Sequence, residues 1–231
     1  FSTVTGAGPG TISKWISAGY RSIDDVRHAA AGGRVKLTTI QDIGLTYYKD
    51  LIQRIPRDEV EAIIGLVACA AREISPDIRV VPAGSYRRGK PDSGDVDILL
   101  VARYRHVQSM PHVHLPLAPH LGTLMRIELM RPVVRVLVGS VRISFLVKMR
   151  TFQRQVDLLL VHPENYWAAL LYFTGGAEHV RDMRNRCQER GMRLNQDGLF
   201  KAVHTSIKHP TGLMPIPLHS ERDLYDILGI E

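Results

Sequence analysis

The stretch from Val80 to Ala102 constrains this chain more than any other part of its sequence. An apolar run leads into Gly84, a basic and turn-rich loop follows, and a second apolar run extends from Val96 to Val101. Two carboxylates, Asp95 and Asp97, stand where this second run begins. Side chains two positions apart on a strand point to one face, so these carboxylates lie together and repel each other. Such a pair at the start of an apolar strand is costly unless a cation joins it.

Mg²⁺ is the cation that we expect at this pair, because it takes carboxylate oxygens and keeps positions open for water and substrate phosphates. The preceding loop offers matching anion-binding groups: glycines that let backbone N–H groups approach a phosphate, hydroxyl donors and positive charges. These groups belong to Gly84, Ser85, Arg87, Arg88, Lys90, Ser93 and Gly94. A hairpin with a solvated Asp-x-Asp and a basic turn is the plain alternative, and the complete string favours the phosphate site over it.

Asp157 is a single carboxylate within a later apolar run, from Gln155 to Val161. A buried carboxylate needs a partner, so Asp157 alone could be a satisfied core residue. Beside a pair of aspartates, a third metal ligand from a neighbouring strand is the better interpretation. We expect this run, with those at Val133–Val138 and Val141–Val147, to extend the sheet in an antiparallel manner.

Length and composition bound the remaining interpretations. The chain has 231 residues, of which 45% are hydrophobic, which is enough for one large core or for two to three small subdomains. No apolar run reaches the length of a membrane span. Cys69 and Cys187 are far apart and indicate free thiols in a reducing compartment. The formal charge of +7 favours polyanionic partners. The proline-rich segment from Pro111 to His120 has three histidines and indicates a solvated loop rather than a metal site.

The N-terminal segment from Val4 to Thr11 is a glycine-rich turn, and helices are expected from Thr11 to Ala18 and from Ser22 to Ala30. This is the helix-hairpin-helix pattern, in which backbone N–H groups at a helix N-terminus face a DNA phosphate. The glycines concerned are Gly6, Gly8 and Gly10. An ordinary glycine-rich turn between two helices is the alternative.

The string from Gly84 to Asp97 resembles the signature of the nucleotidyltransferase superfamily and, within it, of the family X DNA polymerases. The string Tyr172-Phe173-Thr174-Gly175 before a basic helix also resembles this family, and such strings occur in order from Val4 to Gly229. The resemblance implies an α+β chain in three parts. These are helical fingers with a helix-hairpin-helix (residues 1–54), a nucleotidyltransferase palm with a mixed or antiparallel sheet and flanking helices (55–162), and a small α+β thumb (163–231).

The resemblance also implies the reaction: template-directed addition of deoxynucleotides to a primer 3′-OH in short gaps during DNA repair, by two-metal-ion nucleotidyl transfer. It makes Asp95, Asp97 and Asp157 the catalytic residues, holding two Mg²⁺ ions, or Mn²⁺ in their place. The implied nucleotide-binding residues are Arg54, Gly84, Ser85, Arg88, Ser93, Gly94, Tyr172, Phe173 and Gly175. The implied DNA contacts, beyond the hairpin glycines, are Arg154, Arg181 and Arg184. Backbone carbonyls of Ser2, Val4 and Ala7 would hold Na⁺ or K⁺ at the hairpin.

Two departures from the family pattern matter for the site. The family often has an arginine two residues before the third aspartate, whereas this chain has Gln155, and we expect Arg154 to compensate in part. Val180 stands where relatives have an asparagine that faces a base edge. Family members that work with poor template guidance carry a long loop in this sheet, whereas here Gly139 and Ser140 alone separate two of the expected strands. The resemblance therefore favours templated synthesis. Family X enzymes of this type also carry an N-terminal lyase domain, which the residues from Phe1 onward do not resemble, so we expect no 5′-deoxyribose phosphate lyase activity from this chain.

The expected partners are gapped or primer-template DNA, deoxynucleoside triphosphates and further DNA-repair proteins, with no membrane. We expect a monomer that acts in the nucleus or in another reducing compartment that contains DNA. Two other functions stay open from the sequence. One is a different nucleotidyltransferase, of the poly(A) or small-substrate type. The other is a non-catalytic DNA-binding repair scaffold.

Overall fold

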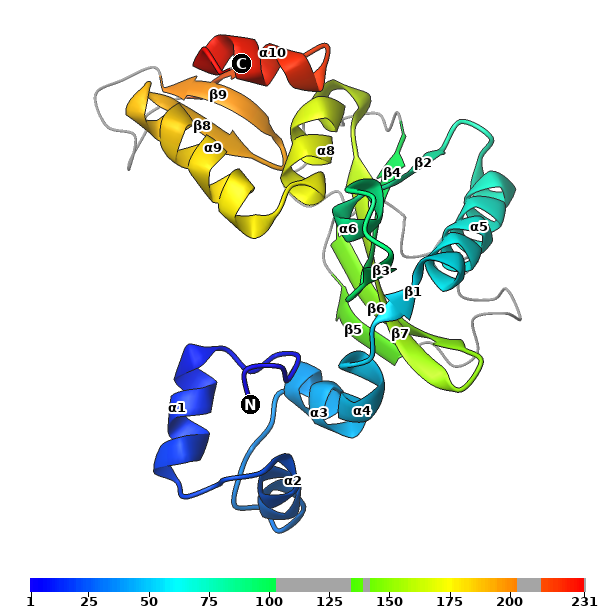
Figure 1. Ribbon diagram of the computed structural model, residues 1–231, viewed down its shortest axis with the longest axis vertical. Coiled ribbons are helices and arrows are strands. Elements are labelled where there is room, and N and C mark those ends of the chain that lie inside the picture. The colour runs from blue at the N-terminus through cyan, green and yellow to red at the C-terminus, as the bar shows by residue number, and fades with distance from the viewer. Residues whose placement is uncertain (103–133, 139–141, 203–212, 231) are drawn as a thin grey trace, which may run out of the picture.

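A computed structural model of the chain describes residues 1–102, 134–138, 142–202 and 213–230. The three-histidine segment at 111–120 and the Gly139-Ser140 connection lie outside the described residues. The chain folds in three consecutive parts (Figure 1). A central sheet has the N-terminal helices near one end and the C-terminal helices and small sheet near the other. This is an α+β arrangement, as the sequence predicts.

The N-terminal part is helical. It consists of α1 (Pro9–Ser17), α2 (Ile23–Ala31), α3 (Thr39–Thr46) and the single turn α4 (Tyr48–Leu51). Capping boxes start two of the helices: Ser22 with Asp25 begins α2, and Thr38 with Gln41 begins α3. The small core that joins the helices is formed by Val4, Trp15, Val26 and Leu45.

The central sheet has five strands in the order β2-β4-β7-β6-β5. Their bounds are β2 (Arg79–Pro82), β4 (Val96–Val101), β5 (Val134–Val138), β6 (Arg142–Met149) and β7 (Phe152–Val161). β4 and β7 are parallel, and the other neighbouring pairs are antiparallel. The antiparallel extension predicted for the three later runs is found among β5, β6 and β7, and the parallel pairing of β7 with β4 makes the sheet a mixed one. Hairpin pairing of β7 with β6 leaves its free edge beside β4, where it runs in the same direction as β4.

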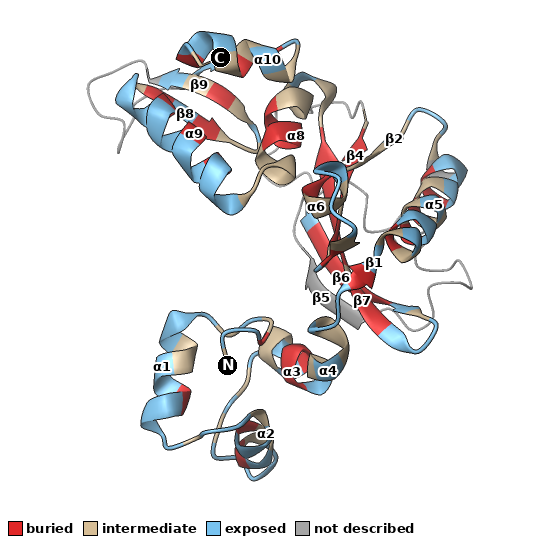
Figure 2. Ribbon diagram, in the orientation of Figure 1, coloured by how far each residue is buried: buried red, intermediate tan, exposed pale blue. Residues whose placement is uncertain are grey.

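Each face of this sheet packs against a different helix. Helix α5 (Arg57–Ile74) covers one face through Val60, Ile63 and Val67, which contact the even-numbered residues of β4 and β7. The odd-numbered residues point to the other face. There, Leu99, Val101, Leu159 and Val161 pack against α8 (Tyr166–Thr174). Figure 2 shows the resulting buried strands between exposed helix surfaces.

The face that packs against α8 is not apolar along its whole length. At the far end of the sheet, Leu146 of β6 packs against Ile43 of α3. Asp97 of β4 and Asp157 of β7 belong to the same face, because they share the parity of Leu99 and Leu159. The sheet thus places two carboxylates between an apolar contact with the C-terminal part and one with the N-terminal part.

The C-terminal part begins at the short 3-10 helix η2 (Pro163–Asn165) and continues into α8. It includes α9 (Ala177–Glu189), α10 (Glu221–Leu228) and an antiparallel sheet of β8 (Met192–Asn195), β9 (Gly198–Ala202) and β10 (Leu213–Ile216). Met183, Cys187, Leu199 and Leu224 are in its core.

Cys187 and the exposed Cys69 are both free thiols, as the sequence indicates. No described helix is both long enough and apolar enough to cross a bilayer.

Candidate active site

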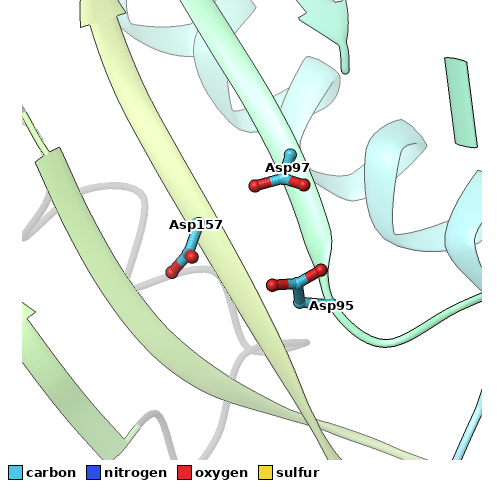
Figure 3. A group of neighbouring side chains, drawn as sticks. All are labelled: Asp95, Asp97 and Asp157. Carbon is cyan, nitrogen blue, oxygen red and sulfur yellow. The ribbon is translucent and has the colours of Figure 1, made fainter. Parts of the chain in front are cut away.

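Three carboxylates converge beside the start of β4, where this strand pairs with β7 (Figure 3). Asp95 immediately precedes β4, Asp97 lies on β4, and Asp157 is the register partner of Asp97 on β7. One carboxylate oxygen from each residue lies within 4.8 Å of the other two. The structure therefore brings together the acidic residues that the sequence singles out.

These carboxylates are short of compensating charge. Burial, followed by repulsion from Asp95 and Asp157, raises the pKa of Asp97 to about 7. Burial and then the charge of Asp157 also raise the pKa of Asp95. Desolvation and like charges act in this direction wherever a cation is lacking. The donor set consists of carboxylate oxygens alone, which suits a hard divalent cation such as Mg²⁺.

The loop before the aspartates is pressed against them at Gly84. This residue begins the short helix α6 (Gly84–Arg87) with φ +55°, in the left-handed region that favours glycine. A Cβ atom at this position would overlap Oδ2 of Asp97. The N–H of Ala83 donates to the backbone oxygen of Asp97 over 2.9 Å. The predicted phosphate-binding loop therefore starts within contact of the carboxylates.

The second half of this loop is held by a two-residue ladder. In it, β1 (Ile55–Pro56) pairs with β3 (Asp92–Ser93), which places the buried Ser93 opposite Ile55. Ser93 Oγ lies 2.8 Å from Ser85 Oγ. Arg54, directly before β1, forms an ion pair of 2.7 Å with Asp92. A Cβ atom on Gly94 would lie 3.1 Å from the guanidinium of Arg54. The structure therefore gathers Arg54, Ser85, Ser93 and Gly94 into one cluster.

The same loop contacts the end of α8. Arg88 Nη1 donates to the backbone oxygens of Thr174, over 2.5 Å, and Gly175, over 3.3 Å. Arg87 donates to Thr174 Oγ1 over 3.1 Å. The rings of Tyr172 and Phe173, in the last turn of α8, lie 5.5 Å apart. The predicted nucleotide-binding residues of the two parts of the chain thus meet through Arg88.

Arg154 does not take the place predicted for it. Its side chain is 4% exposed and donates to Glu59 of α5 over 2.8 Å. Since it lies three positions from Asp157 on one strand, it points to the opposite face of the sheet. The predictions that Arg154 contacts DNA and that it compensates for Gln155 are therefore wrong. The cation beside Asp157 is Arg142 of β6, which the sequence did not indicate; its Nη2 lies 2.8 Å from Asp157 Oδ2.

The other residues predicted to bind DNA lie in two places, the N-terminal turn before α1 and helix α9 of the C-terminal part (Figure 1). Gly6 takes φ +84° in the turn before α1, Gly8 is the N-cap of α1, and Gly10 lies in its first turn, where N–H groups have no intrahelical acceptor. Ser2, Val4 and Ala7 belong to the same turn, in which Ala7 N–H donates to the backbone oxygen of Val4.

On α9, Arg181 and Arg184 line a hollow of about 450 Å³ together with Arg193 of β8. Val180 is buried and contacts the position of Gly175, so its side chain belongs to the packing of this part.

Comparisons with known proteins agree with this architecture. Three family models match in order: the fingers domain of DNA polymerase lambda at residues 1–52, the DNA polymerase beta palm at 54–163 and the DNA polymerase beta thumb at 169–231. A crystal structure of Leishmania infantum polymerase beta, a ternary gap complex, shares the fold. It aligns with a TM-score of 0.83 and 23% identity, over 100% of this chain and 85% of that one.

Curated relatives match the chain over nearly all of its length. It is 32% identical to DNA polymerase lambda of Rattus norvegicus and 28% identical to that of Arabidopsis thaliana. It is 25% identical to the DNA nucleotidylexotransferase of Xenopus laevis. The alignments cover 100%, 99% and 100% of this chain, and the chain spans 40%, 44% and 50% of the respective relatives. With fingers, palm and thumb in this order around three converging carboxylates, the chain belongs to the family X DNA polymerases.

Proposed function

We propose that this chain is a template-directed DNA polymerase that adds deoxynucleotides to a primer 3′-OH in short gaps during DNA repair. One observation carries the proposal: three carboxylates lie within 4.8 Å of one another, directly beside a loop suited to phosphates. A phosphoryl-transfer site needs both elements, because it must position a triphosphate and neutralise charge at the reacting phosphorus.

Asp95, Asp97 and Asp157 would hold two Mg²⁺ ions, with Mn²⁺ as a substitute. When bound, these ions lower the pKa of the primer hydroxyl and offset charge on the α-phosphate and the leaving pyrophosphate. The contribution of the protein is to fix the acidic ligands on rigid strands. Because Asp97 and Asp157 are register partners across β4 and β7, their separation is set by the sheet. We place Asp157 on the primer side of the site.

The triphosphate would lie against the loop that begins at Gly84. Ser85 and Ser93, which share a hydrogen bond of 2.8 Å, would donate to phosphate oxygens. Arg54, Arg88 and Gly94 complete this cradle. Arg88 supports the assignment because it also holds the end of α8, so that binding of a phosphate and placement of the thumb are linked through one side chain.

The sugar and base would lie against Tyr172, Phe173 and Gly175, where the aromatic rings would exclude a ribose 2′-OH. The hydrogen bonds from Arg88 to the backbone oxygens of Thr174 and Gly175, which directly follow the two aromatic residues, support this assignment. Arg181 and Arg184 on the exposed surface of α9 would contact the template strand. Gly6, Gly8 and Gly10 would bind a primer phosphate, with Na⁺ or K⁺ held by the carbonyls of Ser2, Val4 and Ala7.

The proposed partners are gapped or primer-template DNA, deoxynucleoside triphosphates and further repair proteins. The formal charge of +7 supports a polyanionic partner. Two free thiols support a reducing compartment, and we propose that the chain acts in the nucleus as a monomer.

The test is incorporation of each labelled deoxynucleotide into a duplex with a one-nucleotide gap, for each of the four template bases. We expect incorporation of the complementary nucleotide in each case. Equal incorporation opposite all bases would point to untemplated transfer. Adenylation of RNA or of a small molecule, without gap filling, would support a different nucleotidyltransferase. Binding to the gapped duplex without incorporation at any Mg²⁺ or Mn²⁺ concentration would support the scaffold function.

A further inference from the structure

Asp157 has an unusual environment among the three carboxylates. Its side chain is 5% exposed, although two further carboxylates lie within reach of it. Within the described part of the chain, one cation lies within ion-pair distance of any of the three: Arg142. Arg54 is paired with Asp92 instead, and Arg88 donates to backbone oxygens of Thr174 and Gly175.

The register of the sheet explains how Arg142 reaches Asp157. Ser144 of β6 is directly opposite Asp157, and Arg142 is opposite Leu159. Arg142 is therefore a diagonal neighbour of Asp157 on the same face, at a spacing that long side chains can bridge. Its Nη2 donates to Asp157 Oδ2 over 2.8 Å, and its guanidinium lies 6.0 Å from the ring centroid of Phe173. The arginine thus contacts both the acidic cluster and the aromatic end of α8.

Position 155 faces the same carboxylate from within β7. Gln155 Nε2 lies 3.5 Å from both oxygens of Asp157, so a longer side chain at this position would also reach them. Glutamine supplies a neutral and distant donor, whereas a guanidinium supplies a charged and directional one. In this chain the charged donor comes from the neighbouring strand.

We propose that Arg142 is a positioning residue of the active site, which holds the Asp157 carboxylate through Oδ2 and leaves its other oxygen for a metal ion. The inference rests on the proposed function. It deepens it by assigning to β6 the arginine that orients the third acidic ligand. Outer residues of this kind fix the rotamer of a ligand, and their loss typically weakens metal affinity or activity by about 10–100-fold.

The first test is Arg142→Ala, compared with Arg72→Ala on the exposed surface of α5, which covers the opposite face of the sheet. For Arg142→Ala we expect kcat for gap filling to fall about 10–100-fold. The nucleotide KM should stay within about threefold, because the interaction acts on the geometry of the reacting groups. Mn²⁺ binding to the protein–DNA complex without nucleotide, followed by electron paramagnetic resonance, should weaken about tenfold. The Arg72 variant should match the wild type in all three.

The second test moves the guanidinium along the sheet. The double variant Arg142→Ala/Gln155→Arg should regain most of the kcat and Mn²⁺ affinity that Arg142→Ala loses, because the new side chain reaches Asp157 from β7. Arg142→Lys should regain less, since an ammonium lacks the planar fork. A purely structural role for Arg142 would show no rescue from position 155.

Three results would overturn the proposal. In the first, Arg142→Ala has the activity and Mn²⁺ affinity of the wild type. In the second, adding Gln155→Arg does not restore what Arg142→Ala loses. In the third, Arg142→Ala binds gapped DNA more weakly while its kcat is unchanged. The last result would make Arg142 a DNA phosphate contact. If the wild-type protein fills no gap, the proposed function fails, whereas the Mn²⁺ measurements still decide whether Arg142 positions Asp157.

Discussion

Gly84 is the residue at which backbone conformation and chemistry are most closely linked. It joins β2 to the phosphate loop in a left-handed conformation, and the space that a Cβ atom would need is taken by the carboxylate of Asp97. Any side chain here would have to displace an acidic ligand or the loop itself. In the proposed site, this glycine would therefore set how closely the triphosphate and the metal ligands approach each other.

Gly84→Ala should consequently lose both stability and activity. The left-handed backbone alone costs about 1–2 kcal/mol for a residue with a Cβ atom, before the overlap with Asp97 is included. Gly65→Ala is the matched control, because a Cβ atom at this position in α5 meets nothing within 4 Å. It should stabilise the protein by about 0.5–1 kcal/mol. Urea denaturation measures both changes, and a Gly84 variant as stable and active as the wild type would contradict this explanation.

Without a bound metal ion, the ionised carboxylate of Asp97 should lower the stability of the folded protein. Its pKa is 3.8 as the ordinary value and about 7 in the folded protein, so the folded state binds more protons between these limits. The contribution of Asp97 to the free energy of unfolding should therefore fall as the pH rises from about 4 to about 7. Asp97→Asn removes the ionisation, and at pH 8 in EDTA we expect its Tm to exceed that of the wild type by about 2–8 °C.

The control for this prediction is Asp77→Asn, which changes an exposed aspartate far from the sheet face. Its Tm should not change with respect to the wild type. Added Mg²⁺ should raise the Tm of the wild type more than that of Asp97→Asn, because it binds the ionised cluster in the folded state. A wild type more stable than Asp97→Asn at pH 8 without metal would show that the charge on Asp97 is already compensated.

Residue types in the sequence predicted the acidic cluster but not its cation. Asp95, Asp97 and Asp157 are conspicuous because carboxylates in apolar runs need a common partner. Arg142 sits at the start of an apolar run, and only the strand register makes it a neighbour of Asp157. For Arg154, the odd spacing to Asp157 already implied the opposite face. Arg154 is next to Gln155 in the sequence, but side-chain alternation along β7 places it on the side of the sheet that faces α5.

At the scale of elements, β7 is the strand on which the palm depends. It is buried on both faces and joins the parallel and antiparallel parts of the sheet. Its arginine, Arg154, is 4% exposed and pairs with Glu59 at the start of α5. Removing these two charges from water costs free energy, which is offset only while each charge stays beside its partner. The ion pair therefore also holds α5 against β7.

Arg154→Ala should therefore destabilise the protein by about 3–5 kcal/mol, because it leaves the charge of Glu59 buried without its partner. Replacing both residues by apolar ones, as in Arg154→Met/Glu59→Leu, should recover most of this loss. Arg222→Ala removes an exposed pair with Asp226 in α10 and should cost less than about 1 kcal/mol. The changes in the free energy of unfolding are measured by urea denaturation. Equal losses for Arg154→Ala and Arg222→Ala would contradict the penalty expected for leaving Glu59 buried and unpaired.

Helix α9 presents arginines to the outside of the thumb. If Arg181 and Arg184 contact template phosphates, each alanine variant should reduce the slope of log Kd against log salt by about one. Arg186→Ala, which removes a pair with Asp182 on the same helix, is the control and should leave the slope unchanged. If Arg181→Ala and Arg184→Ala both keep the slope of the wild type, these arginines do not contact template phosphates.

The helices were easier to predict than the sheet. Local signals such as Ser22 with Asp25 mark a helix start within a few residues, and the structure places a capping box there. The strand order β2-β4-β7-β6-β5 depends on contacts between distant segments. No local pattern specifies that β7 inserts beside β4, so the parallel pairing that brings Asp157 to Asp97 had to come from the structure.

At the scale of the whole molecule, the sheet face that bears the aspartates contacts both the N-terminal and the C-terminal part of the chain. Leu146 contacts the fingers at one end of it, and Leu159 contacts α8 at the other. Arg87 adds an ion pair of 2.6 Å with Glu221 of α10, which joins the phosphate loop to the thumb. Fingers and thumb thus contact the sheet on either side of the carboxylates, an arrangement that would suit binding of DNA from both sides of the reacting phosphate.

The measurement that tests the central claim most directly is single-turnover filling of a one-nucleotide gap by Asp95→Ala, Asp97→Ala and Asp157→Ala, with the Kd for gapped DNA measured in parallel. If the three carboxylates form one metal-binding unit, each variant should lose a factor of about 10³ or more in rate while its DNA affinity stays within about threefold of the wild type. Retention of more than about a tenth of the wild-type rate by any one variant, with normal DNA binding, would contradict a shared catalytic role.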